Sequence, residues 1–354
     1  MTPWKRDVYT RRRAVCLWLA VLLSLCLTCF VGCSDQIYDP TQGSLSRIEG
    51  NQTREPQTGS SGGDESLRLE IRTEAPTGSV IQIPTTDPFE NAEHIMRVDF
   101  LNVGNADAIL LRMDDTVILV DTGESGDYHI ISQKLKACGI GRIDHLIISH
   151  YDNDHIGTAA QILADYEVVN VYMPEYVRDS SLYRRMMSTL DVLEGKTTVY
   201  RLTEDMNLSL PYGRVWINPT ALYEPGKILG SDNSHSLEEN NYSLITSVRF
   251  GDIELLLTGD AERERMAEFA SLEEVASWDY DLIKTPHHGG YDKALGEFIR
   301  NTAPRYCTVC AGDESVVDSS LVTAMRSVGS AAYYTYDGEL HFTTDGESMV
   351  MSRN

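Results

Sequence analysis

The chain has 354 residues, of which 42% are hydrophobic, so a large folded core is expected and disorder throughout is excluded. The formal net charge is −23, and it becomes −27 without residues 1–32, which hold five basic residues and one acid. A surface this acidic repels polyanions, which argues against a protein that holds nucleic acid mainly by neutralising its phosphates.

Residues 1–32 have the layout of an export signal. Basic residues precede the uncharged apolar run AVCLWLAVLLSLCLTCFVG, which ends just before Cys33. The junction FVGC resembles the lipobox of bacterial lipoproteins, which predicts a lipidated Cys33 and a membrane-anchored lipoprotein outside the cytoplasm. An uncleaved single membrane span and another export route, such as the twin-arginine route, stay open as alternatives.

Residues 33–94 are predicted to form a flexible polar linker. Segments such as QTGSSGGDES and PTTDP contain too few apolar residues in register to build a core. Residues 95–354 have no repeat at the usual solenoid periods and are expected to form one domain.

Within that domain, short apolar runs alternate with amphipathic segments. Helices are predicted at 127–139, 158–166, 180–195, 261–272 and 319–329. Strands are predicted at 95–104, 107–113, 116–123, 143–150, 214–219, 243–251, 253–260, 280–286, 304–312, 331–337 and 339–345. Strands and helices mixed in this order predict a layered α/β protein.

The pair Cys307 and Cys310, in the sequence CTVC, suggests a redox or metal site at first sight. The surrounding sequence RYCTVCAG has the pattern of a buried strand, in which three residues span roughly 10 Å and the two side chains face opposite ways. That separation is too large for a disulfide. We therefore expect both cysteines to pack in the core.

The motif with the clearest chemistry is SHYDNDHIG, at residues 149–157. Its H-x-D-x-D-H spacing places four metal-ligand side chains, His150, Asp152, Asp154 and His155, on one short loop between a predicted strand and a predicted helix. Capping of the helix would explain a single acidic residue here, but it does not explain the whole cluster.

Two later segments carry further candidate residues at the ends of predicted strands. LLLTGD ends with Asp260, and IKTPHHGG contains Lys284 and the adjacent pair His287 and His288. Side chains at the carboxyl end of a strand point into the loop layer, where sites are usually built. Asp260 is also a candidate N-cap of the following helix, and Lys284 is equally well explained as a surface lysine.

These motifs, in this order, resemble those of the metallo-β-lactamase superfamily, and within it the C-terminal hydrolase domain of ComEC-type DNA-uptake proteins. VDFLNVGNADAILLR has Asn105-Ala106-Asp107 where that group usually has Gln-Gly-Asp, VILVDTG contains Asp121, and HYDNDHIG is similar to its metal loop. ENNYSL, LLLTGD and KTPHHGG match its later motifs. The resemblance covers residues 95–350 and implies a four-layer αβ/βα sandwich with the metal ions at one edge.

The resemblance also implies a set of metal ligands for two divalent ions, Zn²⁺ or Mn²⁺. The first ion would be bound by His150 and Asp152, and Asp260 would bridge the two ions. The second would be bound by Asp154, His155 and one of His287 or His288. We assign His287 as that ligand, which leaves His288, with Lys284, to stabilise charge or protonate the leaving group.

The third ligand of the first ion stays open. In many members of the superfamily it is a histidine on the loop that here contains HSLEENNYSL, whereas ComEC-like proteins have an asparagine-rich stretch. Asn240 or Asn241 is therefore expected near the substrate or the metal, with His235 as an alternative. The superfamily pattern also suggests that Asp154 orients or deprotonates the attacking water.

These inferences predict a metal-dependent hydrolase, in which two ions lower the pKa of a shared water. The expected substrate is a phosphodiester in DNA, a nucleotide or a smaller molecule, and no protein partner is expected. Hydrolysis of a lactone, thioester or β-lactam is an alternative, which Asp152 disfavours because β-lactamases more often have histidine there. A non-catalytic binding module is a third reading. The stretch AGDESVVDSSLVTAM lacks the Gly-His-Pro loop of ComEC-like domains, which puts the substrate in doubt.

Overall fold

The structure is a computed structural model that describes residues 88–353 except 225–227, 230–236 and 277–278. The predicted export signal, Cys33, most of the predicted linker and His235 lie outside the described residues. None of the described helices combines the length and hydrophobicity that a membrane crossing requires. The end of the predicted linker packs on the domain, because Phe89 is buried and the His94 ring stacks on Tyr212.

The first sheet has eight strands in the order β17-β16-β1-β2-β3-β4-β5-β7. Strands β17 to β3 in this order pair antiparallel, and β3, β4, β5 and β7 pair parallel. The strands are β1 (Met96–Phe100), β2 (Ile109–Met113), β3 (Thr116–Val120), β4 (Arg142–Ile147), β5 (Glu167–Pro174), β7 (Thr198–Leu202), β16 (Leu340–Thr344) and β17 (Met349–Arg353).

The second sheet has seven strands in the order β15-β14-β13-β12-β11-β9-β8. Strands β8, β9, β11 and β12 pair antiparallel, and β12 to β15 pair parallel. The strands are β8 (Met206–Leu210), β9 (Gly213–Asn218), β11 (Ile245–Phe250), β12 (Ile253–Leu257), β13 (Leu282–Lys284), β14 (Tyr306–Val309) and β15 (Ala331–Tyr334). A separate parallel pair joins β6 (Val177–Arg178) and β10 (Ile228–Leu229).

The helices follow the expected amphipathic pattern, as in α9, where Leu295, Phe298, Ile299 and Thr302 form one buried face. The α-helices are α2 (Tyr128–Ala137), α3 (Asn153–Ile156), α4 (Ala159–Asp165), α5 (Ser181–Val192), α6 (Leu237–Asn240), α7 (Arg263–Ala270), α8 (Glu273–Ala276), α9 (Leu295–Thr302) and α10 (Ser319–Val328). Three 3₁₀ segments are η1 (Pro286–Gly289), η2 (Glu314–Val316) and η3 (Thr335–Asp337).

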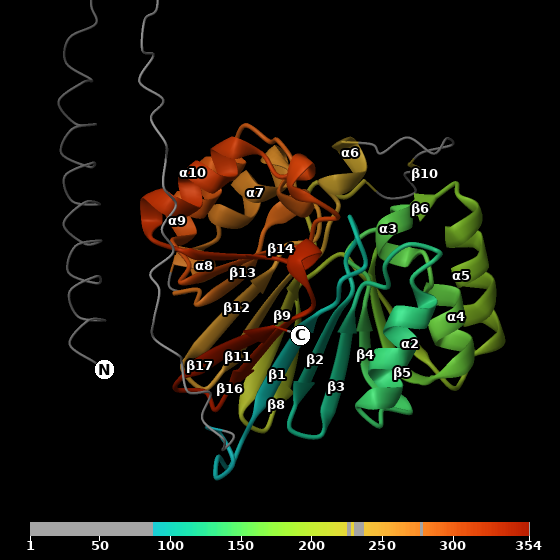
Figure 1. Cartoon of the computed structure of the whole chain (residues 1–354). Helices are drawn as coiled ribbons and strands as arrows, with labels where there is room; N and C mark the ends of the chain where they lie inside the picture. The colour runs from blue at the N-terminus through green and yellow to red at the C-terminus, as the bar shows by residue number, and fades with distance from the viewer. Residues whose placement is uncertain (1–87, 225–227, 230–236, 277–278, 354) are drawn as a thin grey trace, which may run out of the picture. The chain divides into compact units, whose positions relative to one another are not determined.

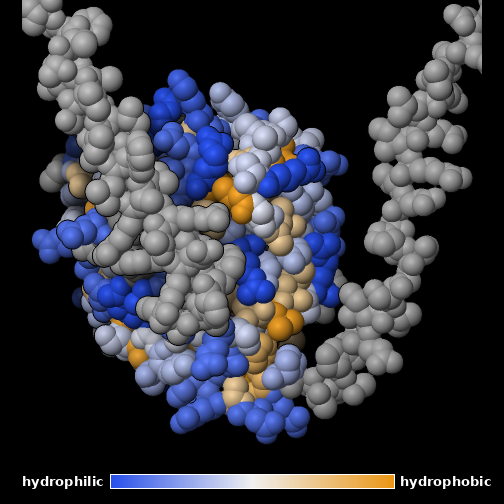
Figure 2. Space-filling model, turned by 90° about the vertical axis from the view of Figure 1, so that its left-hand side faces the viewer, coloured by the Kyte–Doolittle hydropathy of each residue, from blue (hydrophilic) through white to orange (hydrophobic). Residues whose placement is uncertain are grey.

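The two sheets face each other, with helices on both outer sides (Figure 1). Apolar residues of β1–β3 and β16 pack between the sheets against β9, β11 and β12. A second core lies under α2, α4 and α5, and a third under α7, α9 and α10. These layers confirm the αβ/βα sandwich. On the face in Figure 2, hydrophilic residues surround smaller groups of hydrophobic ones, as expected for helices that bury one side.

The two cysteines of CTVC lie in different cores. Cys307 packs beneath the helices α7, α9 and α10, and Cys310 packs between the sheets. Both thiols are free and buried. The expectation that they are packing residues on opposite faces of a strand is therefore confirmed.

The loop that follows β4 is fixed against the loop that follows β3. The backbone N–H of Thr122 donates to the His155 carbonyl at 2.7 Å, and the Gly157 N–H donates to the Gly123 carbonyl at 2.8 Å. Gly157 allows this contact because a Cβ there would lie 2.3 Å from the backbone carbon of Glu124. The loop that carries the candidate ligands is thus held by backbone contacts, and the approach at position 157 requires glycine.

We predict that Gly157→Ala lowers the free energy of unfolding by about 1–3 kcal/mol, because the backbone of the neighbouring loop must move. Gly141→Ala is the matched control, since a Cβ there meets nothing within 4 Å. It should change stability by less than about 0.5 kcal/mol. Denaturant unfolding of the three proteins tests this, and equal stability of the two variants would contradict it.

Candidate metal centre

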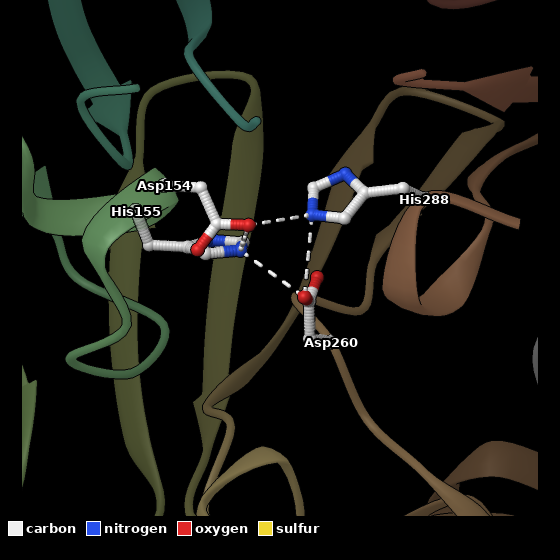
Figure 3. A group of neighbouring side chains, drawn as sticks. All are labelled: Asp154, His155, Asp260 and His288. Carbon is white, nitrogen blue, oxygen red and sulfur yellow. Dashed lines mark hydrogen bonds and ion pairs between the residues drawn. The ribbon is translucent and has the colours of Figure 1, made fainter. Parts of the chain in front are cut away.

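The candidate centre lies where the carboxyl ends of the central strands of both sheets meet. Asp154 and His155 belong to α3, just after β4, whereas Asp260 follows β12 and His288 follows β13 (Figure 3). One ligand atom from each of the four residues lies within 4.8 Å of the others. All four are at most 6% exposed, so the group is a buried cluster of two imidazoles and two carboxylates.

The distances within this group suit a metal ion. His288 Nε2 is 3.2 Å from Asp154 Oδ2 and 3.3 Å from Asp260 Oδ2, and His155 Nε2 is 3.3 Å from the same Asp260 oxygen. Donor atoms about 2.0–2.2 Å from a tetrahedral ion are about 3.4 Å apart. Among the described residues, His155 Nε2 and Asp154 Oδ1 are buried without a hydrogen-bond partner, which fits ligand atoms that await a cation.

Hydrogen bonds to the other ring nitrogens orient both histidines. His155 Nδ1 lies 2.8 Å from Asp121 Oδ2, and Asp121 accepts hydrogen bonds from the N–H and the hydroxyl of Ser149. His288 Nδ1 donates to the Cys310 carbonyl at 2.8 Å. Both arrangements direct Nε2 into the centre, which is how ligand histidines are usually held.

The buried charges shift the pKa of each member of the group. Burial alone would lower the pKa of His288, but the charge of Asp260 and the hydrogen bond to Asp154 raise it to about 10. Burial favours the neutral form of Asp154, yet the charge of His155 and the hydrogen bond to His288 lower its pKa to about 2. Without an ion, the positive charges of the protonated imidazoles therefore compensate the negative charges of the carboxylates.

Lys284 lies in the interior, which corrects the reading of it as a surface lysine. Its ammonium donates to the Gly259 carbonyl at 2.7 Å and lies 2.5 Å from Asp107 Oδ2 and 3.3 Å from Asp260 Oδ1. Its three N–H groups are matched by these three acceptors. The side chain is fully buried, so its position suits compensating the charge of Asp107 and Asp260 rather than reaching a leaving group.

His287 and His288 take places that differ from those assigned from sequence. His288 lies inside the group, whereas His287 Nε2 is 4.0 Å from Asp260 Oδ2 and its Nδ1 is 3.2 Å from Glu262. The His287 side chain is 32% exposed and the His288 side chain only 2%. His288, rather than His287, therefore belongs to the group that could hold a metal ion, because the turn after β13 directs the second histidine inward.

His150 and Asp152 form a neighbouring buried pair, with His150 Nε2 3.7 Å from Asp152 Oδ2. Among the described residues, His150 Nε2 has no hydrogen-bond partner. Asp152 is also in contact with the guanidinium of Arg178, which in turn contacts Glu239. The pair is close to the four-donor group, since the His150 and His155 rings are 4.0 Å apart.

The two asparagines expected near the site behave differently. Asn241 accepts a hydrogen bond from the Arg265 N–H at 3.0 Å and donates to Glu264 at 2.8 Å, so it holds the start of α7. Asn240 donates to Glu262 at 3.1 Å, while its buried Oδ1 has no hydrogen-bond partner within the described part of the chain. Asn240 therefore has a buried acceptor that no described hydrogen bond uses, whereas the amide of Asn241 is engaged at the start of α7.

The residues that sequence reasoning left without a role are those that support the ligands. Asp107 and Asp121 were visible in the recognised motifs, because both follow or precede apolar strands. Arg178 and Glu239 gave no local signal, since they come from segments 61 residues apart and meet only in the fold.

The fold and the site together define an αβ/βα protein with a buried histidine–carboxylate group that could hold a metal ion. The family model of the metallo-beta-lactamase superfamily matches residues 101–313, more than half of the chain. The chain belongs to this superfamily, whose fold implies divalent metal ions at this edge.

Two relatives are of the ComEC type. The chain is 22% identical over 246 residues to ComE operon protein 3 of Bacillus subtilis. This match covers 61% of this chain and 28% of that protein. It is 27% identical over 222 residues to Recombination protein 2 of Haemophilus influenzae, and this match covers 61% of this chain and 24% of that protein. The match thus spans roughly a quarter of the length of each relative.

Two solved structures are similar to the chain at lower sequence identity. The metallo-beta-lactamase fold protein YhfI from Bacillus subtilis is 12% identical with a TM-score of 0.46, over 73% of this chain and 100% of that one. CmlA, a diiron beta-hydroxylase from Streptomyces venezuelae, is 17% identical with a TM-score of 0.43, over 74% and 54%.

We predict that ion binding releases protons at neutral pH. Because the pKa of His288 is raised to about 10, its ring is protonated near pH 7 in the ion-free protein, and this favourable charge is lost only as the pH rises towards 10. An ion that binds Nε2 must displace that proton, so affinity should rise about tenfold per pH unit for each proton displaced.

Calorimetric titration with Zn²⁺ or Mn²⁺ in buffers of different ionisation enthalpy measures this release. At least one proton per ion is expected at pH 7. An affinity that stays constant between pH 6.5 and pH 8, with no proton release, would contradict the arrangement of His288 in the centre.

Proposed function

We propose that this protein is a metal-dependent hydrolase that cleaves a phosphodiester bond in DNA, a nucleotide or a smaller molecule, outside the cytoplasm and tethered through a lipid on Cys33. The observation that carries the proposal is the buried group of Asp154, His155, Asp260 and His288, whose ligand atoms lie within 4.8 Å. Two divalent ions bound there and beside it, Zn²⁺ or Mn²⁺, would supply Lewis acidity and lower the pKa of a water.

Asp154 is the residue best placed to take the proton of the attacking water. Its Oδ2 faces His288 Nε2 at 3.2 Å, whereas its Oδ1 has no hydrogen-bond partner among the described residues. One carboxylate can therefore orient an ion with one oxygen and hold a proton with the other. Hydrogen bonds to Asp121 and to the Cys310 carbonyl keep the rings of His155 and His288 in position.

His287 takes the role of proton donor to the leaving group in this proposal. It is the more exposed member of the pair and lies beside the centre. Burial lowers its pKa, but the hydrogen bond to Glu262 and the charge of Asp260 outweigh burial and raise it. A raised pKa keeps more of the imidazole protonated near neutral pH, which a general acid requires.

Asp152 supports a phosphodiester over the alternative substrates. A carboxylate at this position makes the neighbouring ion site richer in oxygen, which suits Mn²⁺ better than an all-imidazole site does. A non-catalytic binding module would be expected to have lost ligand residues, whereas every donor of the four-residue group is present and buried.

We predict that the full-length chain, loaded with Mn²⁺ or Zn²⁺, hydrolyses bis-p-nitrophenyl phosphate, and that His288→Ala removes both the bound ion and this activity. His287→Ala should keep the ion. It should slow a diester with an alkoxide leaving group by about a hundredfold and slow the p-nitrophenyl diester much less, because that leaving group needs no proton.

The control is His129→Ala, which removes an exposed histidine on α2 and should leave ion and rate unchanged. Single-stranded DNA, double-stranded DNA, a β-lactam and a lactone are assayed in parallel. Faster turnover of the β-lactam or the lactone than of the phosphodiesters would contradict the proposed substrate class. A bound ion without turnover of any substrate would support the non-catalytic binding module.

A further inference from the structure

The starting point is a buried ion pair beside the metal centre. The guanidinium of Arg178, on β6, contacts both Asp152 of the metal loop and Glu239 of α6. All three side chains are at most 3% exposed. Burying a guanidinium is costly unless carboxylates compensate it closely. The fold therefore holds Arg178 against the residue expected to bind the first ion, Asp152.

Glu239 is itself fixed, so Arg178 cannot easily leave Asp152. Tyr176 donates its hydroxyl hydrogen to Glu239 Oε1 at 2.7 Å, and the same hydroxyl accepts the N–H of Tyr151 at 2.9 Å. The chain of contacts therefore runs from the backbone next to His150, through Tyr176 and Glu239, to Arg178 and back to Asp152.

The two ion positions differ in what they offer. The group around His288 has four compact donors. The other position has His150 Nε2 and Asp152 Oδ2, 3.7 Å apart. Across the residues that the structure describes, neither of these two belongs to a compact cluster of three or more such donors. Moreover, Asp152 shares its negative charge with Arg178, which weakens its attraction for a cation.

We propose that Arg178, held in place by Glu239, makes the first ion position weak, so that the protein retains one ion in the four-donor group and takes up the second reversibly. Arg178 is then a positioning residue that acts through Asp152. Arg178 contacts Oδ1 of Asp152, whose Oδ2 faces His150, and it reduces the negative charge that this carboxylate offers to a cation. Hydrolysis would depend on the free metal concentration through this second ion alone.

The inference rests on the proposed metal-dependent function, but ion binding tests it independently of turnover. Full-length protein, freed of metal and titrated with Mn²⁺, should bind one ion tightly and a second at least about tenfold more weakly. In Arg178→Met/Glu239→Gln, which removes one charge of each sign, the second ion should bind about ten- to a hundredfold more tightly, the usual size of outer-partner effects on metal affinity.

Glu239→Gln alone should act in the opposite direction, because Arg178 then pairs with Asp152 only and weakens the second ion further. Arg178→Lys keeps the charge and should keep the weak position. The matched control removes an exposed ion pair, Arg184→Met/Asp179→Asn, and should change neither affinity.

Two ions of equal affinity in the unaltered protein would overturn the inference. The inference would also be overturned if the affinity for the second ion, compared with that for the tightly bound ion, did not rise in Arg178→Met/Glu239→Gln. A failure of that affinity to fall in Glu239→Gln would overturn it as well. The tight ion reports folding in every variant, and absence of any bound ion in the unaltered protein would refute the proposed function instead.

Discussion

The structure depends on a set of buried carboxylates at one edge of the sandwich. Asp107, Asp121, Asp154 and Asp260 are at most 6% exposed, and burying ionised carboxylates costs several kcal/mol each unless they are paired. Their partners come from both halves of the fold. Asp107, before β2, pairs with Lys284 of β13 across the sheets, while Asp260, after β12, faces histidines from both halves. The same charges therefore join the halves and create the place where a divalent ion is stabilised.

Backbone strain marks the same edge. Among the described residues, five non-glycine residues have a positive φ. One of them, His288, belongs to the four-residue group, and two others, Asp121 and His287, lie next to it. Each such residue costs on the order of 1–2 kcal/mol. Because His287 and His288 both have a positive φ, the chain turns His288 inward and leaves the His287 side chain partly exposed beside the group. Strain of this kind persists where the surroundings fix it, and here the hydrogen bond from His288 to the Cys310 carbonyl does so.

The sequence predicted the members of the candidate group better than their surroundings. Asp154, His155 and Asp260, which the structure brings together, could be found because local patterns place them directly after apolar strands, and parallel strands bring such ends together. The order of His287 and His288 could not, since it depends on φ angles that two adjacent histidines do not reveal. The strands and α-helices that were also missed are β5, β6, β7, β8, β10, β17, α6, α8 and α9. Segments such as β8, with few buried residues, gain their strand conformation from pairing with a neighbour rather than from their own pattern.

The acidic surface bears on the size of the substrate. At physiological salt, charges interact over about 8 Å, so a long polyanion meets repulsion from each phosphate that approaches a chain with a net charge of −23. A small diester brings one phosphate charge to a centre where the proposed cations would reverse the local sign. The electrostatic repulsion between the acidic surface and the substrate therefore grows with the number of phosphates. The attraction by the ions acts only on the one phosphate that reaches them. Within the proposed class, this balance favours a nucleotide or smaller diester over DNA.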